Sequence, residues 1–258
     1  PDEYHEDVDD NAFTNWMARW NLRAGVEVWE WLKRGFPARA ERLSAKLGLS
    51  EEEVRVWGEI AEKIFLPWGE DALIEQFKGY FALENIDLRS LEPRTRSVRD
   101  LLGPERTKGS QVIKQPDVLM LLYLMREEFD KDTLRVNWEY YEPRTDHSFG
   151  SSLGPAIHTA LAARLGRTGE ACEHLQRAAF VDLEDTRGNT RDGIHMASAG
   201  GLWQALVFGF AGLELTSEGP KVTPRLPPHW RRLRFSICYR GQRFPFDIKG
   251  QDSGDSKQ

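Results

Sequence analysis

The chain has 258 residues, of which 40% are hydrophobic and 29% are charged, and its formal net charge is −6. This composition is typical of a globular protein with one large domain, or with one domain and a small second one. An acidic chain is poorly suited to the phosphate backbone of nucleic acids, so we expect no nucleic-acid partner. The sequence contains no apolar run of about 18 residues and no signal-peptide pattern, which favours a cytoplasmic protein without a membrane partner.

The two cysteines and nine tryptophans indicate which cofactors and ligands to expect. Cys172 and Cys238 lie far apart and form no metal-ligand spacing, so we expect free thiols and no metal site. No glycine-rich nucleotide motif is present, and no cofactor is expected. The tryptophans predict a core rich in aromatic side chains, although aromatic faces that stack on sugar rings would fit a carbohydrate ligand as well.

The first part of the chain is predicted to be helical after an acidic opening. PDEYHEDVDD carries six carboxylates, and apolar residues then recur at steps of three and four over 13–31, which predicts an amphipathic helix ending near Gly35. A second helix is expected in ARAERLSAKLG, and a third follows Ser50, which has the capping-box spacing with Glu53. The segment 65–104 contains several prolines and glycines, so we expect a long, partly irregular connection.

The remainder of the chain is predicted to be helical until a short β-tail. Helices are expected in QPDVLMLLYLMREEF, KDTLRVNWEYYE, LGPAIHTALAARLG, GEACEHLQRAAF and HMASAGGLWQALVFGF. Beyond Gly212, apolar and polar residues alternate in LRFSICYRG, which predicts a half-buried strand, and RFPFDIK follows Gly241 as its hairpin partner.

The predicted fold is therefore mainly α. We expect a helical domain over residues 1–212 and a small β-sandwich-like domain with a polar tail over residues 213–258. A run of antiparallel helices fits an α/α toroid or a helix bundle equally well, because periodicity alone does not separate these two architectures.

Two polar stretches place reactive side chains next to predicted helix starts. In PDEYHED, neighbouring carboxylates and partial burial could raise the pKa of one carboxyl group and make it a general acid. The ordinary alternative is a solvated acidic cap before the first helix. In VIKQPD, Lys114 and Gln115 could hold sugar hydroxyls by directional hydrogen bonds, whereas an exposed lysine before a helix N-cap is the ordinary alternative.

Two further stretches combine small polar residues with predicted helix starts. In RTDHSFGSSLGP, Ser151 and Ser152 follow Gly150 just before a helix, so backbone N–H groups and two hydroxyls could hold an anion such as phosphate. A serine-capped helix is the equally weighted alternative. In RDGIHMASAGGLW, His195 lies beside small residues that would let a ligand approach the backbone, but a satisfied core histidine is the ordinary alternative.

Taken together and in order, five stretches closely resemble glycoside hydrolase family 65, which consists mainly of inverting phosphorylases of α-glucosides such as maltose, trehalose and kojibiose. They are PDEYHEDVDDNAFTN, VIKQPDVL, YYEPRTDHSFGSSLGPAIH, DGIHMASAGGLWQALVFGFAGL and PRLPPHWRRLRFSICYRG. The resemblance extends from Pro1 to about Ile248. It implies part of an (α/α)6 toroid of the six-hairpin glycosidase type, followed by a small C-terminal β-domain. In that family the PDEYHE motif lies mid-chain, so the resemblance implies a C-terminal portion that does not turn over substrate alone.

The same resemblance implies roles for the acid and for the sugar-binding residues. Glu3 would be the general acid that protonates the glycosidic oxygen, with Glu6 as the less favoured candidate. Lys114 and Gln115 would hold the glucosyl unit. The substrate would be an α-linked glucosyl disaccharide of the kojibiose, maltose or trehalose type. The long loop RTDHSFGSSLG is most similar to that of kojibiose-type members.

By the same resemblance, Ser151, Ser152 and His195 would hold inorganic phosphate, the co-substrate. Phosphate would attack the anomeric carbon with inversion and give β-glucose 1-phosphate, so only one catalytic carboxylate is needed. A homodimer is one option for the complete protein.

Two other functions compete with phosphorolysis. An inverting hydrolase on the same scaffold would need a base near the phosphate region, where Asp146 is the only acid in the RTDHSFGSS loop. A noncatalytic helical module that binds sugars would show binding that does not depend on Glu3.

Overall fold

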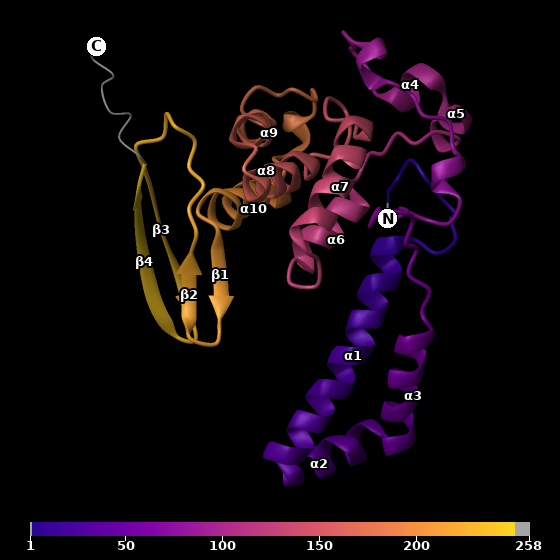
Figure 1. Ribbon diagram of the computed structural model, residues 1–258, viewed down its shortest axis with the longest axis vertical. Helices are drawn as coiled ribbons and strands as arrows, with labels where there is room; N and C mark the ends of the chain where they lie inside the picture. Colours follow the sequence, from indigo (N-terminus) through magenta and orange to yellow (C-terminus); the bar gives the residue numbers. More distant parts are fainter. Residues whose placement is uncertain (1, 251–258) are drawn as a thin grey trace.

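The computed structural model describes residues 2–250 and begins with a helical arm (Figure 1). The arm consists of α1 (Ala12–Gly35), α2 (Pro37–Leu47) and α3 (Glu51–Lys63). Asn11 caps α1 by accepting from Thr14 N, and Ser50 caps α3 by accepting from Glu53 N. Gly48 ends α2 with a positive φ of 67°, a conformation that favours glycine. α3 runs back along α1, so the three predicted helices are confirmed.

An irregular connection follows the arm, as predicted. It contains 3₁₀ turns at Tyr80–Ala82 and Leu88–Leu91, then α4 (Val98–Leu102) and α5 (Pro104–Lys108). The Asn137 side chain accepts from Ile74 N (2.9 Å) and donates to Ala72 O (2.9 Å), so a side chain of α7 fastens this connection to the helical body. Such bonds supply the partners that irregular backbone needs when it is buried.

The helical body follows in chain order. Its helices are α6 (Asp117–Leu124), α7 (Lys131–Tyr141), α8 (Gly154–Leu165), α9 (Thr168–Phe180) and α10 (Met196–Gln204). α6 ends five residues before the predicted boundary, in a turn where Glu128 N donates to Met125 O. α10 continues into a π-helical turn, Ala205–Phe210, which sequence periodicity did not indicate.

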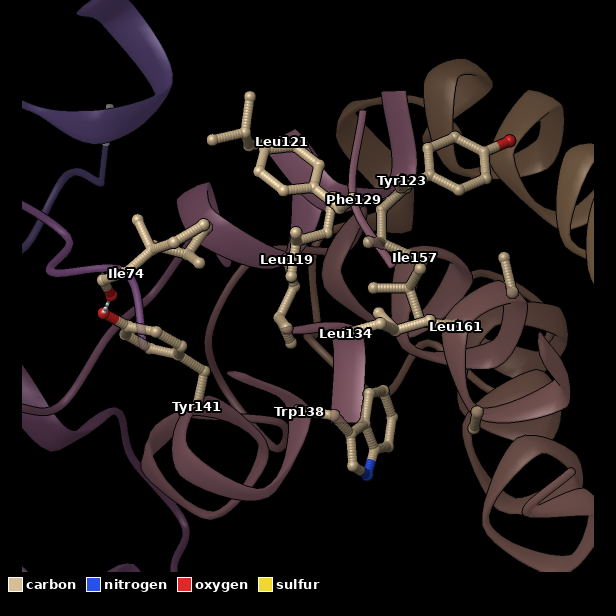
Figure 2. Close-up of a cluster of buried hydrophobic side chains, with 14 of the residues drawn as sticks. Ile74, Leu119, Leu121, Tyr123, Phe129, Leu134, Trp138, Tyr141, Ile157 and Leu161 are labelled. Carbon is tan, nitrogen blue, oxygen red and sulfur yellow. Dashed lines mark hydrogen bonds between the residues drawn. The ribbon is translucent and has the colours of Figure 1, made fainter. Parts of the chain in front are cut away.

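The main hydrophobic core lies between these helices (Figure 2). Trp138 of α7 is 1% exposed and packs near Leu134, Leu161 and Ile157. Replacing a tryptophan at such a position with alanine typically costs about 3–5 kcal/mol. The Tyr141 side chain reaches toward the irregular connection, where its hydroxyl donates to Ile74 O. The same core thus holds α7 and the connection together.

The C-terminal region consists of two antiparallel hairpins. Their strands are β1 (Leu213–Thr216), β2 (Gly219–Val222), β3 (Arg232–Tyr239) and β4 (Gln242–Lys249). The β3–β4 hairpin was predicted from alternation, whereas the four-residue β1–β2 hairpin was not. Tyr239 Oη donates to Thr216 O (3.0 Å) and links the two hairpins. The predicted polar tail over 251–258 lies outside the described residues.

The tryptophans and cysteines have mixed environments. Trp16, Trp29 and Trp138 are buried, but Trp20 and Trp31 are 45% and 56% exposed, so the predicted aromatic core accounts for only part of the set. Both cysteines are free, as predicted. Among residues 2–250, none of the helices combines the length and apolar character that crossing a bilayer requires.

Candidate active site

Asp2 organises the acidic opening instead of belonging to a solvated cap. Its side chain is buried, and Oδ1 accepts from the backbone N–H groups of Lys114 (2.8 Å) and Gln115 (2.9 Å). Oδ2 lies 2.7 Å from His5 Nδ1, and the Asp2 backbone N–H donates to Asp117 Oδ2 (3.0 Å). Charged acceptors make stronger hydrogen bonds than neutral ones. Asp2 therefore joins segments that lie more than 110 residues apart.

Asp117, the first residue of α6, completes this framework. Its Oδ2 also accepts from Asn11 Nδ2 (2.9 Å), the residue that caps α1. Burial raises the pKa of Asp117. The starts of α1 and α6 are therefore held on one buried carboxylate, which fixes the backbone on both sides of Glu3.

Glu3, Lys114 and Gln115, predicted as the acid and the sugar-binding pair, are in direct contact. Glu3 Oε1 accepts from Gln115 Nε2 (2.6 Å), and the Glu3 backbone N–H donates to Gln115 Oε1 (2.8 Å). Glu3 Oε2 forms an ion pair with Lys114 Nζ. The Glu3 side chain is 62% exposed, so its carboxylate faces solvent between two donors.

The ionisation of Glu3 differs from the expectation for the acidic motif. The hydrogen bond from Lys114 lowers the pKa of Glu3 below its usual value, and this outweighs the opposing effect of burial. The predicted rise from neighbouring carboxylates and burial is wrong for the ligand-free site, because Asp2 points inward and Glu3 is mostly exposed. Glu3 is thus ionised as long as Lys114 donates to it.

Glu6 lies in the same cleft but makes fewer contacts. Glu3, Glu6 and Arg99 line a cleft of about 640 Å³, together with residues of the α1 start. Glu6 Oε1 is 3.9 Å from an Arg99 guanidinium nitrogen, an exposed pair with little fixed geometry. Glu3 is therefore the better positioned of the two carboxylates.

The loop RTDHSFGSS, residues 144–152 and called the serine loop below, runs beside the segment that carries Lys114. Ile113 N donates to Arg144 O (2.9 Å), Asp146 N donates to Ile113 O (2.9 Å), and Ser151 N donates to Lys114 O (3.1 Å). Gln115 and Ser151 also line one small cavity of about 160 Å³. The structure thus brings the predicted sugar-binding and phosphate-binding segments together.

Asp146 is committed to structural hydrogen bonds. It accepts from an Arg94 guanidinium nitrogen (2.9 Å), Tyr4 Oη (3.1 Å) and Phe149 N (3.0 Å), and its side chain is fully buried. Burial acts to raise the pKa of Asp146, but the hydrogen bonds, above all that from Arg94, leave it below the usual value. This carboxylate has no free position from which to activate a water molecule, as a hydrolase base would need.

Ser198, which sequence analysis missed, links Ser152 to the start of α10, where His195 also lies. The Ser198 hydroxyl donates to Ser152 Oγ (2.8 Å), and His195 is the N-cap residue of the helix that carries Ser198. The N-terminus of α8 lies beside Ser152, and neither α8 nor α10 has a side-chain N-cap hydrogen bond. Gly154 N and Met196 N, the first N–H groups of the two helices, donate to Ser151 O and Ile194 O, and the positive ends of the two helix dipoles favour an anion at this place.

Asp182 orients His195 and was also missed. His195 Nδ1 lies 2.6 Å from Asp182 Oδ1, and the His195 backbone N–H donates to Asp182 Oδ2 (2.8 Å). Because a carboxylate only accepts, Nδ1 carries the proton and Nε2 remains available to a ligand. His195 is 25% exposed, so it is not a core histidine. The two residues are 13 positions apart in different elements, so the pair has no sequence signal.

A cation also lies against the serine loop. Arg187 donates to Gly150 O, and its Nε is buried without a partner among residues 2–250. Arg187 and Ser152 both line a cavity of about 510 Å³. Sequence analysis did not single out this arginine, because nothing in the stretch VDLEDTRGN distinguishes it from any other loop arginine. Only its burial against the serine loop does.

Comparison with known proteins places this geometry in a family. The model of the "Glycosyl hydrolase family 65 central catalytic domain" matches residues 1–204, and that of the "Glycosyl hydrolase family 65, C-terminal domain" matches residues 213–253. The chain belongs to glycoside hydrolase family 65. The predicted fold class is confirmed, because the family 65 chain forms part of an (α/α)6 toroid followed by a small β region.

Several relatives of this family 65 chain are phosphorylases. It is 42% identical over 245 residues to the kojibiose phosphorylase of Thermoanaerobacter brockii, covering 93% of this chain and 31% of the relative. It is 36% identical to the α,α-trehalose phosphorylase of the same organism, covering 94% and 31%, and 34% identical to the maltose phosphorylase of Bacillus subtilis, covering 94% and 31%. The chain thus spans about a third of the length of these curated relatives.

A solved structure shares the fold of the family 65 chain. This protein, from the human microbiome, carries the provisional name kojibiose phosphorylase and superposes with a TM-score of 0.83 at 28% identity. The match covers 96% of this chain and 34% of that one. The arrangement of helices and hairpins described above is therefore also found within a longer chain.

Proposed function

We propose that this chain contributes the acid and phosphate side of an inverting phosphorylase that cleaves an α-linked glucosyl disaccharide into β-glucose 1-phosphate and glucose. The observation that carries the proposal is the Glu3 carboxylate held between the side chains of Lys114 and Gln115. The backbone of Lys114 is in turn hydrogen-bonded to the serine loop. An acid and an anion-binding loop in this order match the two parts that phosphorolysis requires.

Substrate binding would convert Glu3 from a carboxylate into an acid. In the ligand-free site the pKa of Glu3 is lowered, chiefly by the hydrogen bond from Lys114. If the hydroxyls of a glucosyl unit take the donors of Lys114 and Gln115, Glu3 loses both stabilising partners and its pKa rises. The site would then deliver a proton to the glycosidic oxygen as the bond to the anomeric carbon breaks.

The phosphate would lie at the serine loop. Ser151 and Ser152 supply hydroxyls, His195 supplies Nε2, and the α8 and α10 N-termini add backbone N–H groups. A phosphate oxygen would form the new bond to the anomeric carbon from the face opposite the leaving group, with inversion. The proton that the phosphate then releases restores the proton that Glu3 gave up.

The hydrolase alternative has less support than phosphorolysis. An inverting hydrolase places a base carboxylate where it can activate water. Asp146, the acid of the serine loop, is buried and accepts from four donors, whereas the groups around Ser152 and His195 are suited to an anion. A noncatalytic sugar-binding module would not require the fixed contacts of Glu3, and it remains the other alternative.

The substrate that we propose is a kojibiose-type disaccharide. The relatives named kojibiose phosphorylase include one at 42% identity, above the values for the trehalose and maltose phosphorylases compared here. The proposal includes phosphate as co-substrate without a further cofactor, and a cytoplasmic enzyme, consistent with two free cysteines. A homodimer is part of it only for the complete protein.

The decisive experiment uses the intact protein that carries this chain. It is incubated with kojibiose, maltose, trehalose and nigerose, with and without phosphate, and β-glucose 1-phosphate and free glucose are quantified. The proposal expects phosphate-dependent formation of β-glucose 1-phosphate, with kojibiose as the preferred sugar. Glucose release that does not need phosphate would show a hydrolase, and no product from any sugar would favour the noncatalytic module.

A further inference from the structure

Three histidines and a glutamate meet beside the serine loop. Glu142 follows α7, His147 lies in the loop, His158 belongs to α8 and His174 to α9. The ring centroids are 4.6 Å apart for His147 and His158, 4.7 Å for His147 and His174, and 5.0 Å for His158 and His174. Three of the six histidines of the chain thus share one place, outside the contacts of Glu3 and His195.

These rings have unused nitrogen atoms. His147 Nδ1, His158 Nε2 and His174 Nδ1 are buried and have no hydrogen-bond partner within residues 2–250. His158 is fully buried and His174 is 4% exposed. A buried polar atom without a partner typically costs about 1–3 kcal/mol. The opposite nitrogens of two of these rings, Nε2 of His147 and Nε2 of His174, both face the Glu142 carboxylate.

The spacing of the ligand-type atoms fits a tetrahedral metal ion. Glu142 Oε1 lies 3.3 Å from His147 Nε2 and 3.6 Å from His174 Nε2, and these three atoms all lie within 4.8 Å of one another. Ligand atoms about 2.1 Å from a tetrahedral ion are themselves about 3.4 Å apart. The observed separations therefore leave room for one ion between the glutamate and two imidazoles.

The hydrogen bonds within the cluster also bear on metal binding, because a coordinating nitrogen must be free of its proton. His147 Nε2 also lies 3.1 Å from Glu142 O, so binding would move its proton to Nδ1, the nitrogen that now lacks a partner.

We propose that Glu142, His147 and His174 bind a divalent transition-metal ion of the Zn²⁺ type, with His158 packed against the site. Imidazole and carboxylate together suit this class of ion, and His147 lines the 510 Å³ cavity through which an ion can enter. The ion would clip the end of α7 to α9 and hold the loop that continues to Ser151. Sequence analysis predicted no metal, because these ligands are 5 and 27 residues apart without a characteristic spacing.

The test measures metal binding without sugar or phosphate, so its result is independent of the proposed function. The intact, untagged protein is stripped with chelator and titrated with Zn²⁺ by calorimetry and with Co²⁺ by visible absorbance. We expect one saturable site with the absorbance of tetrahedral Co²⁺. In E142Q and H174Q, affinity should fall at least about tenfold. H229Q, which replaces an exposed histidine outside the cluster, is the matched control and should bind like the wild type.

Several results would overturn the proposal. They are the absence of saturable binding by the wild type, and equal binding by the wild type, E142Q and H174Q. If circular dichroism shows that the buried H174Q variant does not fold, E142Q and H147Q carry the test, because the side chains of Glu142 and His147 are both partly exposed. Zn²⁺ should also raise the melting temperature of the wild type and of H229Q but not of E142Q, since only a ligand of the folded state stabilises it.

Discussion

Gly150 is the residue at which a single methyl group should test the alignment of the sugar and phosphate segments. A Cβ at this position would lie 2.1 Å from Asp146 O and 3.1 Å from Lys114 O. Carbon and oxygen atoms do not approach to 2.1 Å without bonding, so in G150A the loop must move by about 1 Å. That shift would break two hydrogen bonds, from Gly150 N to Asp146 O and from Ser151 N to Lys114 O.

The expected magnitudes follow from these contacts. Two neutral hydrogen bonds contribute about 1–3 kcal/mol together, which corresponds to a decrease in melting temperature of roughly 2–12 °C for a domain of 150–250 residues and to a smaller decrease for the longer intact protein. A displacement of about 1 Å of a group that positions substrate can lower turnover about a hundredfold. We therefore expect G150A to remain folded but to lose most phosphorolysis, with a raised KM for phosphate.

The assay compares G150A with G169A in the intact protein. Gly169 lies in α9, and a Cβ there would meet no atom within 4 Å. G169A should keep full activity and gain up to about 1 kcal/mol of stability, because alanine is the better helix former. If G150A has the melting temperature, turnover and phosphate KM of the wild type, then Gly150 does not set the distance between the two segments, and the proposed alignment is refuted.

Three further variants probe single roles. E3Q should lower turnover of a disaccharide about 10²- to 10⁴-fold. Its effect on α-glucosyl fluoride should be far smaller, because the fluoride leaving group needs no acid. Equal losses of turnover for E3Q and E6Q would contradict the assignment of Glu3 as the general acid. Lys114 lowers the pKa of Glu3, and a general acid works only while it is protonated. K114M should therefore move the alkaline limb of the kcat/KM profile to higher pH and lower the maximum of the profile. An alkaline limb at the wild-type pH would contradict the role of the ion pair. D182N should raise the KM for phosphate about 10- to 100-fold with little change in the KM for sugar, since His195 loses a charged hydrogen-bond partner; equal changes in both KM values would contradict this role.

The six carboxylates of the opening show how burial separates residues of like charge. Asp2 is buried and accepts backbone hydrogen bonds, whereas Glu3 and Glu6 are exposed in the cleft. Asp7 and Asp10 adopt positive φ values of 57° and 53°, in the left-handed region that aspartate tolerates better than most residues. The acidic stretch is therefore a folded turn before α1 and not a uniform charged cap.

Most helices and the longer hairpin of this protein follow from local patterns in its sequence. The period of the apolar residues predicted α1 to α3, α7, α8 and α9, and strict alternation predicted the β3–β4 hairpin. The predictions failed where local signals are weak. The β1–β2 hairpin has only four residues per strand, and the π-helical turn allows Gly209 to pack against Ala160, where a Cβ would lie 2.9 Å from Ala160 Cα.

Recognition of ordered motifs extended the prediction to the site. Glu3, Lys114 and Gln115 were expected to act together and are in contact. Ser152 and His195 were expected to share a ligand, and Ser152 accepts a hydrogen bond from Ser198 of α10, the helix that begins after His195. No distance in the sequence indicates these contacts; they followed only from the resemblance to a family in which the motifs occur together.

Which hydrogen bonds each polar side chain makes depends on how distant segments pack together. Asp146 accepts hydrogen bonds from Arg94 and Tyr4, which lie 52 and 142 positions away in the sequence. Asp182 is hydrogen-bonded to His195 and orients its ring. The histidine cluster likewise draws on three elements. Helix and strand signals depend on neighbours within a few residues, whereas burial and partner choice depend on which distant segments pack together. For this reason the elements could be derived from the sequence, but the ionisation and availability of the side chains could not.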